Sequence, residues 1–335
     1  MGVDLIMDRE IMLQALRERL SGMSLTDFAH MFVNETTAIT EFYKLCANRS
    51  AGKHISLLFN PHRLDTDTKI SPISIYKSLS YKSTGRGADP IDGLARLYLY
   101  NLEHDVQDPF FQAIQRGYNG IAYVNEFPPY VARQVYMQYA KSKDGERTYV
   151  LDPCCGWGGR MIGCASIPNT TYIGCDPSTK TYQGLVELGN WLKTLQPTFD
   201  FQVYNIPYEE FQTEQKFDIA LTSPPYFDTE HYSTEQTNSL NRYESGYDTW
   251  VKGFYEPLIK NTMSRLKDDG VFVLNVGDRK YPLSNSMKEI CDNNDIYYNR
   301  IHDYLAGNGE DKEKFWLLTR DKSCCSDTLS TVELF

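Results

Sequence analysis

Two short motifs hold the residue types that could do chemistry in this chain of 335 residues. The first runs from Asp152 to Arg160 as DPCCGWGGR, and its three glycines in four positions let the backbone approach a ligand closely and turn into a helix. It lacks the Gly-Lys-Ser/Thr ending of a phosphate loop. Asp176 follows 24 residues after Asp152. An acid at about this spacing binds ribose hydroxyls in nucleotide folds, and the alternative is that it caps the next helix.

The second motif is TSPPY at residues 222–226. Its two prolines offer no backbone N–H, so the Ser223 hydroxyl and the Pro224 carbonyl stay free to accept hydrogen bonds. Tyr226 adds an aromatic face beside them. This combination suits a planar ligand with an exocyclic amino group. Asn205 ends another predicted strand, where its amide could read an adenine edge or could be a turn residue.

The elements that position these motifs are short apolar runs alternating with helical segments. Predicted strands are 148–152, 171–176, 200–205, 217–223, 270–276 and 314–319, with helices at 181–195 and 249–266. This alternation predicts an α/β fold with a doubly wound, mostly parallel sheet, and ligands bind at the carboxyl ends of such strands. The N-terminal part is predicted to be mainly helical, with helices at 10–20, 25–45, 91–100 and 110–116 and an irregular basic connector at 48–90.

Composition excludes several classes of protein. The chain is 41% hydrophobic with a net charge of -10, and no run approaches the about 18 apolar residues of a membrane-spanning helix. The first residues do not look like a secretory signal. The net charge argues against coating nucleic acid through the overall field. Residues 44–86, however, hold eight basic and two acidic groups, a local charge of 8 − 2 = +6.

The eight cysteines show no metal-binding or disulfide spacing. We expect free thiols in a reducing compartment, the cytoplasm of a bacterial, archaeal or phage-infected cell, and no metal. His231 with Asp228 and Glu230 does not form a recognised ligand spacing. Cys154 and Cys155 are expected to pack as small residues rather than to act as nucleophiles.

DPCCGWGG, GCD and TSPPY together resemble the S-adenosylmethionine-dependent DNA amino-methyltransferases over roughly residues 124–320. The resemblance implies a Rossmann-like class I methyltransferase fold, S-adenosyl-L-methionine as cofactor, and methyl transfer to the exocyclic amino group of a flipped-out base. Cytosine N4 is favoured over adenine N6. The stretch NEFPP at 125–129 looks like the family's further cofactor motif.

By that resemblance the catalytic residues are Ser223, Pro224, Pro225 and Tyr226. The residues expected to bind the cofactor are Phe127, Pro128, Asp152, Pro153, Cys154, Cys155, Gly156, Trp157, Gly158, Asp176, Pro177, Asn205 and Ile206. Among them, Asp152 and the loop from Cys154 to Gly158 would hold the methionine part, and Asp176 the ribose.

DNA recognition must lie outside the interval between the two motifs, because about 70 residues leave no room for a further domain. Residues expected to contact DNA are Lys53, Arg63, Lys69, Lys77, Lys82 and Arg86 of the basic stretch, with His231 and Arg242 of the loop after TSPPY. The alternative for the stretch is a solvated, flexible connector. The expected division is a helical region 1–120, a methyltransferase domain 121–322 and a tail 323–335.

Two rival functions stay open at this point. One is an RNA base amino-methyltransferase, because the fold and related motifs occur there. The other is a cofactor-binding protein that interacts with DNA without methylating it. DNA is the expected partner, with RNA as the alternative and no membrane, and a partner restriction nuclease is neither indicated nor excluded.

Overall fold

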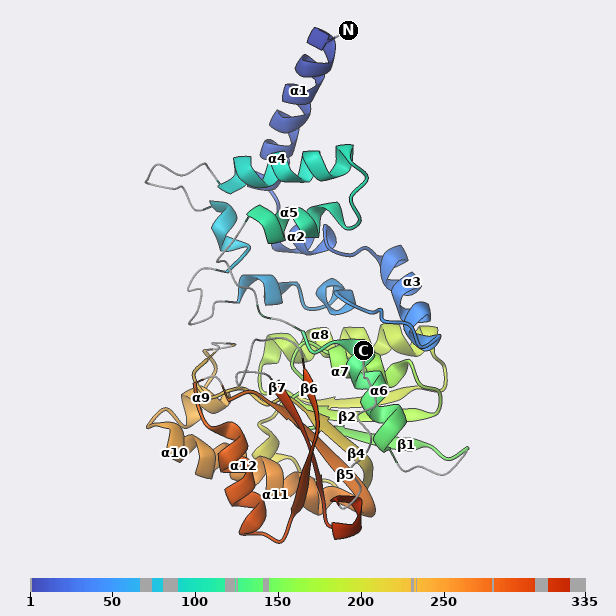
Figure 1. Ribbon diagram of the computed structural model, residues 1–335, viewed down its shortest axis with the longest axis vertical. Coiled ribbons are helices and arrows are strands. Elements are labelled where there is room, and N and C mark those ends of the chain that lie inside the picture. Colours follow the sequence, from blue (N-terminus) through green and yellow to red (C-terminus); the bar gives the residue numbers. More distant parts are fainter. Residues whose placement is uncertain are drawn as a thin grey trace.

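The computed structural model describes residues 2–66, 74–80, 90–117, 124, 126–140, 145–229, 232, 234–278, 280–304 and 313–325. Two regions are visible in Figure 1, a stack of N-terminal helices and a sheet flanked by helices. The N-terminal elements are α1 (Gly2–Ser21), α2 (Leu25–His30), α3 (Glu35–Cys46), α4 (Pro90–Glu103) and α5 (Pro109–Gly117), with short 3-10 helices η1 (Ile55–Leu58), η2 (Pro61–Asp65) and η3 (Lys77–Ser80).

The helix expected over 25–45 is two helices, α2 and α3. Ser24 Oγ accepts the Asp27 amide at the start of α2, and Asn34 Oδ1 accepts the Thr37 amide at the start of α3. Asparagine and serine are among the best N-caps because their side chains satisfy amides that the first turn leaves unpaired. The apolar spacing alone did not reveal this second start.

The described part of the expected basic connector is packed rather than solvated. Ile55, Leu57 and Leu64 of η1 and η2 are buried in the same apolar cluster as the central sheet. The expectation of an irregular connector is therefore wrong for residues 48–66, whose polar composition hides a few well-spaced core residues. Lys69, Lys82 and Arg86 lie outside the described residues.

The sheet has seven strands in the order β3-β2-β1-β4-β5-β7-β6. They are β1 (Thr148–Asp152), β2 (Thr170–Cys175), β3 (Asp200–Tyr204), β4 (Phe217–Thr222), β5 (Leu266–Val276), β6 (Tyr297–Tyr304) and β7 (Glu313–Thr319). The first five strands pair in parallel, whereas β7 pairs antiparallel with both β5 and β6. This confirms the expected doubly wound, mostly parallel sheet. Strand β6 was not expected.

Each face of the sheet is covered by its own set of helices (Figure 1). Val150 of β1 points into a cluster with α6 (Pro129–Tyr139), α7 (Gly159–Ala165) and α8 (Thr179–Leu195). Its neighbour Leu151 points into a second cluster with α11 (Glu256–Arg265) and α12 (Leu283–Asp292). The chain also forms α9 (Ser239–Arg242), α10 (Tyr247–Trp250), the π-helical η5 (Val251–Tyr255), η4 (Tyr208–Glu210) and η7 (Lys322–Cys325).

The N-terminal region docks on the α6–α8 face, on the side of α8 away from the sheet (Figure 1). Trp191 of α8 contacts Phe42 and Phe59 with ring centroids 6.3 and 5.6 Å apart. At Gly184 of α8 an added Cβ would lie 2.2 Å from Asn60 Oδ1. The apolar cluster runs through this contact without interruption. The boundary at residue 120 stays a prediction, but the two regions share a core across it.

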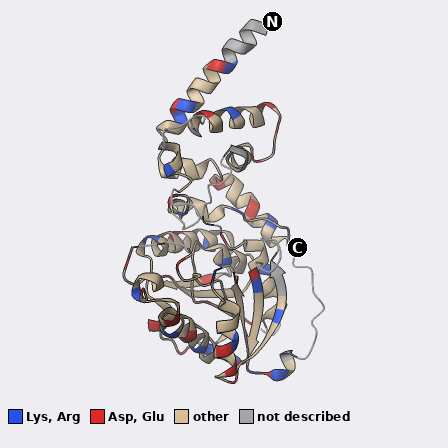
Figure 2. Ribbon diagram, turned by 60° about the vertical axis from the view of Figure 1, so that its left-hand side comes forward, with Lys and Arg blue, Asp and Glu red and all other residues tan. Residues whose placement is uncertain are grey.

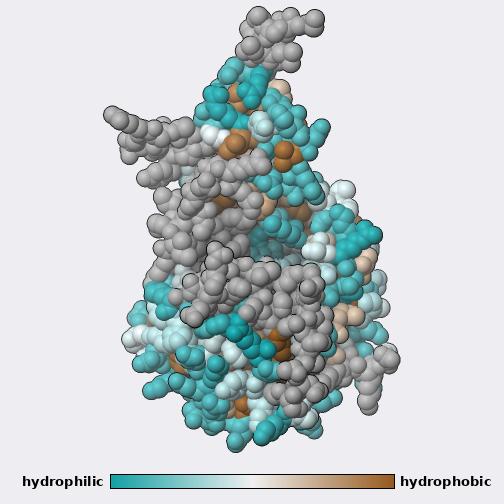
Figure 3. Space-filling view, viewed as in Figure 1, coloured by the Kyte–Doolittle hydropathy of each residue, from teal (hydrophilic) through white to brown (hydrophobic). Residues whose placement is uncertain are grey.

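The described surface is mixed in charge and mostly hydrophilic. Figure 2 shows Lys/Arg and Asp/Glu segments interspersed along both regions. On the face drawn in Figure 3 the hydrophobic atoms form small separate spots. Within the described part of the chain, no helix is both long enough and apolar enough to cross a membrane.

Candidate active site

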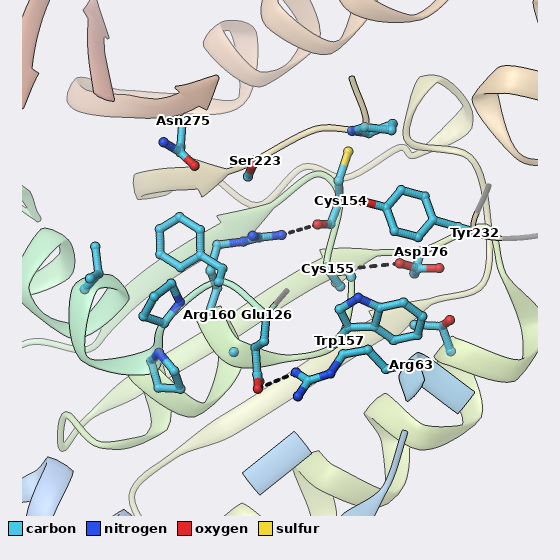
Figure 4. Close-up of a pocket in the computed structure, with 18 of the residues that line it drawn as sticks. Arg63, Glu126, Cys154, Cys155, Trp157, Arg160, Asp176, Ser223, Tyr232 and Asn275 are labelled. Carbon is cyan, nitrogen blue, oxygen red and sulfur yellow. Dashed lines mark hydrogen bonds and ion pairs between the residues drawn. The ribbon is translucent and has the colours of Figure 1, made fainter. Parts of the chain in front are cut away.

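A cavity of about 1110 Å³ opens at the carboxyl ends of the central strands (Figure 4). Its walls come from the glycine loop (Pro153 to Gly158), from the ends of β2, β4 and β5, and from the N-terminal region. We call the last part, formed by Lys53, His54, Arg63 and Phe111, the N-terminal wall. The TSPPY motif and the glycine loop, which are far apart in the chain, therefore line one space.

Asp152 organises the glycine loop but does not line the cavity. It is fully buried, and its carboxylate accepts hydrogen bonds from Arg160 Nε (2.7 Å), the Tyr172 hydroxyl (2.6 Å) and the Thr222 hydroxyl (2.9 Å). The amide of Cys154 adds a fourth bond at 3.2 Å. Asp152 thus holds the glycine loop, β2 and β4 together from behind the cavity wall, and its expected contact with the methionine part of the cofactor stays a prediction.

Arg160 is a cavity cation that the sequence reasoning did not single out. Its side chain is 5% exposed and holds Asp152, while its guanidinium also donates to the Cys154 carbonyl and lies 5.1 Å from the centre of the Phe127 ring. The sequence signal that could have pointed to it is its position as the last residue of DPCCGWGGR. The guanidinium brings a fixed positive charge to the bottom of the cavity.

Two glycines give the loop its shape for different reasons. Gly156 has φ 55° and its amide donates to Asp176 Oδ2 at 3.1 Å, which ties the loop to the end of β2. Gly158 has φ 97°, and an added Cβ would lie 2.4 Å from Leu188 of α8. Gly158 is therefore required by packing on the side away from the cavity, whereas Gly156 lines it.

Asp176 lies in the cavity wall at the carboxyl end of β2. Its oxygens accept the amides of Gly156 (3.1 Å) and Ser178 (3.0 Å). Burial raises the pKa of this carboxyl from 3.8 to about 7, although the two amide bonds oppose the shift. The alternative role as a cap of the next helix belongs instead to Ser178, whose side chain accepts from the Thr181 amide.

Asn205 and Ile206 are not among the cavity-lining residues. The Asn205 amide donates to the Asp176 carbonyl at 3.1 Å and joins the ends of β2 and β3. Ile206 packs against the apolar cluster on the α11 side. Pro207, Tyr208 and Glu209 line the cavity at this point, and Pro177 lines it beside Asp176.

The TSPPY motif leaves β4 directly into the cavity. Thr222 is buried and bonds to Asp152, and Ser223, Pro224, Pro225 and Tyr226 line the wall. The Ser223 and Tyr226 hydroxyls are 3.3 Å apart and share a hydrogen bond. Figure 4 places Ser223 and Asn275 at the same side of the cavity. Asn275 of β5, 2% exposed, is a further lining residue that sequence reasoning missed.

The residue after TSPPY fixes the direction of that loop. Phe227 has φ 54°, a left-handed conformation that is uncommon for a bulky residue. Its buried ring contacts Trp250 and Tyr281, with centroids 5.8 and 5.1 Å apart. These contacts hold the turn that presents Tyr226.

The described residues of the loop that follows contact the segment after Asp176. Glu235 accepts the Thr179 amide and hydroxyl (3.2 and 3.1 Å), and the Thr237 hydroxyl donates to the Pro177 carbonyl (3.1 Å). Tyr232 lines the cavity with its ring 6.1 Å from Trp157, whose other neighbour is His62 at 5.1 Å. His231 lies outside the described residues.

The cysteines of the glycine loop do not have the environment of nucleophiles. Both Cys154 and Cys155 are free thiols, and burial raises the pKa of each well above its usual value. A raised pKa disfavours the reactive thiolate. Across the described residues, no three His, Cys, Asp or Glu side chains are grouped to hold a metal.

Among the residues expected to contact DNA, the four that the structure describes have different surroundings. Arg63 is 1% exposed and paired with Glu126, so burial removes it from any phosphate-binding surface. Lys77 lies 3.9 Å from Asp65, and Arg242 pairs with Glu210 at 2.7 Å. Lys53 lines the cavity with its ammonium 4.2 Å from the centre of the Phe111 ring.

The described residues of the NEFPP stretch, 126–129, belong to the cavity lining. Glu126, Phe127 and Pro128 all line the cavity. The Glu126 side chain is 7% exposed, and its Oε2 accepts from Arg63 Nη1 at 2.6 Å. Beside this pair, burial lowers the pKa of His54 to about 3, so this imidazole is neutral near pH 7.

No protein-family model and no curated protein matches this chain. Among solved structures, it is similar to a methyltransferase from Pyrococcus furiosus (13% identity, TM-score 0.42, covering 60% of this chain and 88% of that one). It is also similar to an rRNA methylase from Streptococcus thermophilus (10% identity, TM-score 0.38, covering 58% of this chain and 96% of that one). A third similar structure is the N-methyltransferase NodS from Bradyrhizobium japonicum (10% identity, TM-score 0.38, covering 56% of this chain and 94% of that one). With every TM-score below 0.5, we take no activity or substrate from these likenesses, and the fold assignment rests on strand order.

Proposed function

We propose that this protein transfers a methyl group from S-adenosyl-L-methionine to the exocyclic amino group of a nucleic-acid base. DNA is the favoured polymer and cytosine N4 the favoured atom. The observation that carries the proposal is the meeting of TSPPY with the glycine loop and Asp176 in one cavity. Neither motif by itself is as specific as the pair on a shared wall.

The residues present fit the proposed cofactor. Asp176 lines the cavity at the end of β2, the position from which an acid binds ribose hydroxyls in nucleotide folds. The glycine loop brings backbone close to the ligand, and Arg160 adds a cation for a carboxylate. When bound, S-adenosylmethionine supplies a methyl group on a positively charged sulfur.

The substrate side of the cavity is suited to an aromatic amine. Ser223 Oγ and the Pro224 carbonyl can accept its two N–H groups, which favours a tetrahedral nitrogen with an available lone pair. Tyr226 offers a ring for stacking, which holds a base independently of its sequence context. Such positioning of two reactants supplies much of the rate acceleration in this kind of reaction. A base inside a duplex cannot reach this cavity wall, so it must be flipped out or unpaired.

The test is incubation with labelled S-adenosylmethionine and mixed DNA or RNA, followed by mass spectrometry of the nucleosides. We expect the labelled nucleoside to be N4-methyl-2′-deoxycytidine. Label in N6-methyladenine, or in ribonucleosides only, would correct the base or the polymer. The absence of label from every nucleoside would contradict the proposal as a whole.

The catalytic assignment is tested with Ser223→Ala and Tyr226→Ala. Each is expected to lower the methyl-transfer rate by on the order of 100-fold, as for other preorganised active-site groups, while binding of S-adenosylhomocysteine stays near that of the unaltered protein. The matched controls are Ser264→Ala and Tyr297→Ala, on α11 and on the edge strand β6, neither of which lines the cavity. Equal activity of catalytic and control variants would remove TSPPY from the mechanism.

A further inference from the structure

The buried pair Arg63–Glu126 is unusual because it is incomplete. Arg63 is 1% and Glu126 7% exposed, and they join at 2.6 Å. Glu126 Oε1 and Arg63 Nε have no hydrogen-bond partner. Buried polar atoms in folded proteins are nearly always paired, so an unpaired carboxylate oxygen on a cavity wall indicates a position for a ligand's N–H group.

Other cavity acids for which the structure gives partners have no buried oxygen left without a hydrogen bond. Asp176 accepts two backbone amides, Glu209 accepts the Tyr243 hydroxyl at 2.9 Å, and Glu41 accepts the Gly52 amide at 3.2 Å. Within the described cavity wall, Glu126 is the acid with an oxygen that is both buried and free.

The position of Glu126 is beside the glycine loop, on the side away from Ser223 (Figure 4). A Cβ added at Gly159, where α7 begins, would lie 3.1 Å from Glu126 Oε1 and 2.0 Å from the Phe127 carbonyl. Arg160, the next residue, brings its guanidinium to the Phe127 ring. A carboxylate and a guanidinium therefore flank the same end of the cavity.

A zwitterionic amino-acid group is the ligand chemistry that needs both charges at once. In the proposed cofactor this group lies at the far end from the adenosine, which Asp176 would hold by its ribose. We propose that Glu126, positioned by Arg63 of the N-terminal region, binds the α-amino group of the cofactor's amino-acid tail. This inference rests on the proposed function and adds a cofactor contact that depends on the docked N-terminal region.

Arg63 is a positioning residue in this arrangement, because it meets Glu126 rather than the ligand. It also donates to Ser56 Oγ at 3.2 Å, so the pair is anchored to η1. Burial raises the pKa of Glu126, and the charge of Arg63 opposes that rise. Docking of residues 55–65 on the sheet domain thus helps to keep a negative charge where a ligand ammonium would lie.

The experiment compares three ligands by calorimetry with the full chain. They are S-adenosylhomocysteine, its analogue with the α-amino group replaced by hydrogen, and 5′-methylthioadenosine, which lacks the whole tail. The unaltered protein should bind S-adenosylhomocysteine roughly ten- to hundredfold more tightly than the deaminated analogue, the usual range for a hydrogen bond to a charged group. Glu126→Gln should remove most of that preference and leave affinity for methylthioadenosine within about twofold.

The matched control is Glu209→Gln, the same change at a cavity acid whose oxygen is already bonded. Any effect there should be equal for the two tail-bearing ligands. Arg63→Met alone leaves a buried carboxylate unpaired, which strongly destabilises the fold. The double variant Arg63→Met/Glu126→Leu removes both charges, should fold, and should bind both tail-bearing ligands equally.

Three results are distinguishable. If the unaltered protein binds neither S-adenosylhomocysteine nor methylthioadenosine, the proposed cofactor is wrong. If it binds S-adenosylhomocysteine without preferring it to the deaminated analogue, the cofactor stands and the role of Glu126 is overturned. The role of Glu126 is also overturned if Glu126→Gln keeps the full preference.

Discussion

Two buried arginine–carboxylate pairs lie at the cavity, and they differ in how complete they are. Arg160–Asp152 lies beside the glycine loop, with Arg160 alone in the cavity lining, and Arg63–Glu126 joins the N-terminal wall to the residues before α6. In Arg160–Asp152 the carboxylate accepts four bonds from within the protein. In Arg63–Glu126 one oxygen and one nitrogen stay unpaired. A pair whose carboxylate oxygens are all hydrogen-bonded within the protein stabilises the fold, whereas a pair with an unbonded oxygen can accept a hydrogen bond from a ligand. Substitutions in the first should cost stability, and substitutions in the second should cost binding.

The largest effect is expected for Asp152→Asn. This change removes the charge that balances buried Arg160 of α7 and weakens bonds to β2 and β4, so the free energy of unfolding should fall by about 3–5 kcal/mol. Urea unfolding monitored by circular dichroism measures it. The matched control is Asp218→Asn, 3% exposed on the same sheet but paired with Lys267, which is 37% exposed and can be hydrated. Equal losses of unfolding free energy in the two variants would show that the hydrogen bonds around Asp152 add no stability beyond that of an ordinary ion pair.

A smaller effect is expected at the contact that docks the N-terminal region. Gly184→Ala places a methyl group 2.2 Å from Asn60 Oδ1 and 2.5 Å from the Phe59 carbonyl, so one side must move. The expected loss is about 1–3 kcal/mol of unfolding free energy. It should be accompanied by a weaker preference for S-adenosylhomocysteine over its deaminated analogue, because Arg63 and Glu126 face each other across this docking contact.

The control for Gly184→Ala is Gly93→Ala in α4, where nothing lies within 4 Å of the added Cβ. Alanine in an open helical position should raise the unfolding free energy by about 0.5–1 kcal/mol and leave ligand preference unchanged. A Gly184→Ala protein as stable as the Gly93→Ala protein would show that the docking contact is loose.

A dependence of the unfolding free energy on pH is expected from Asp176. Its pKa in the folded protein, about 7, is above its ordinary value of 3.8. Between about pH 4 and pH 7 the folded state therefore holds a proton that the unfolded chain has released. The unfolding free energy should fall as pH rises through this window, by at most about 1.4 kcal/mol per pH unit for one group.

The measurement for Asp176 is the difference in unfolding free energy between the unaltered protein and Asp176→Asn across pH 4 to 8. Because other groups titrate in both proteins, only the difference isolates this carboxyl. We expect the unaltered protein to lose stability relative to the variant as pH rises. A difference that does not change with pH would show that the carboxyl is ionised normally.

Strands and loops at the centre of the sheet were predictable because they are determined locally. Buried parallel strands are continuous apolar runs, and the loops after them carry their glycines, prolines and acids in the chain itself. Strand β6 was missed because it lacks this local signal. It lies at the edge of the sheet, pairs only with β7, and its YYNRIHDY sequence alternates too weakly to predict a strand.

The sequence shows which side chains are charged, but it does not show which group each of them pairs with. Arg63 belongs to a basic stretch, and sequence reasoning assigned it to DNA with the others. In the structure it is buried against Glu126, which lies 63 positions later in the chain. Asp152 shows the same limit, because its saturation depends on Tyr172 and Thr222 from neighbouring strands.

The sequence by itself determined where six of the strands lie along the chain, the turn chemistry of the glycine loop and the rigid exit at TSPPY. These depend on periodicity and on the backbone limits of glycine and proline, which act over a few residues. Only the tertiary structure decided which polar groups are satisfied internally and which face a ligand. That distinction requires knowing every neighbour of a buried atom, and for Glu126 the decisive neighbour comes from the N-terminal region.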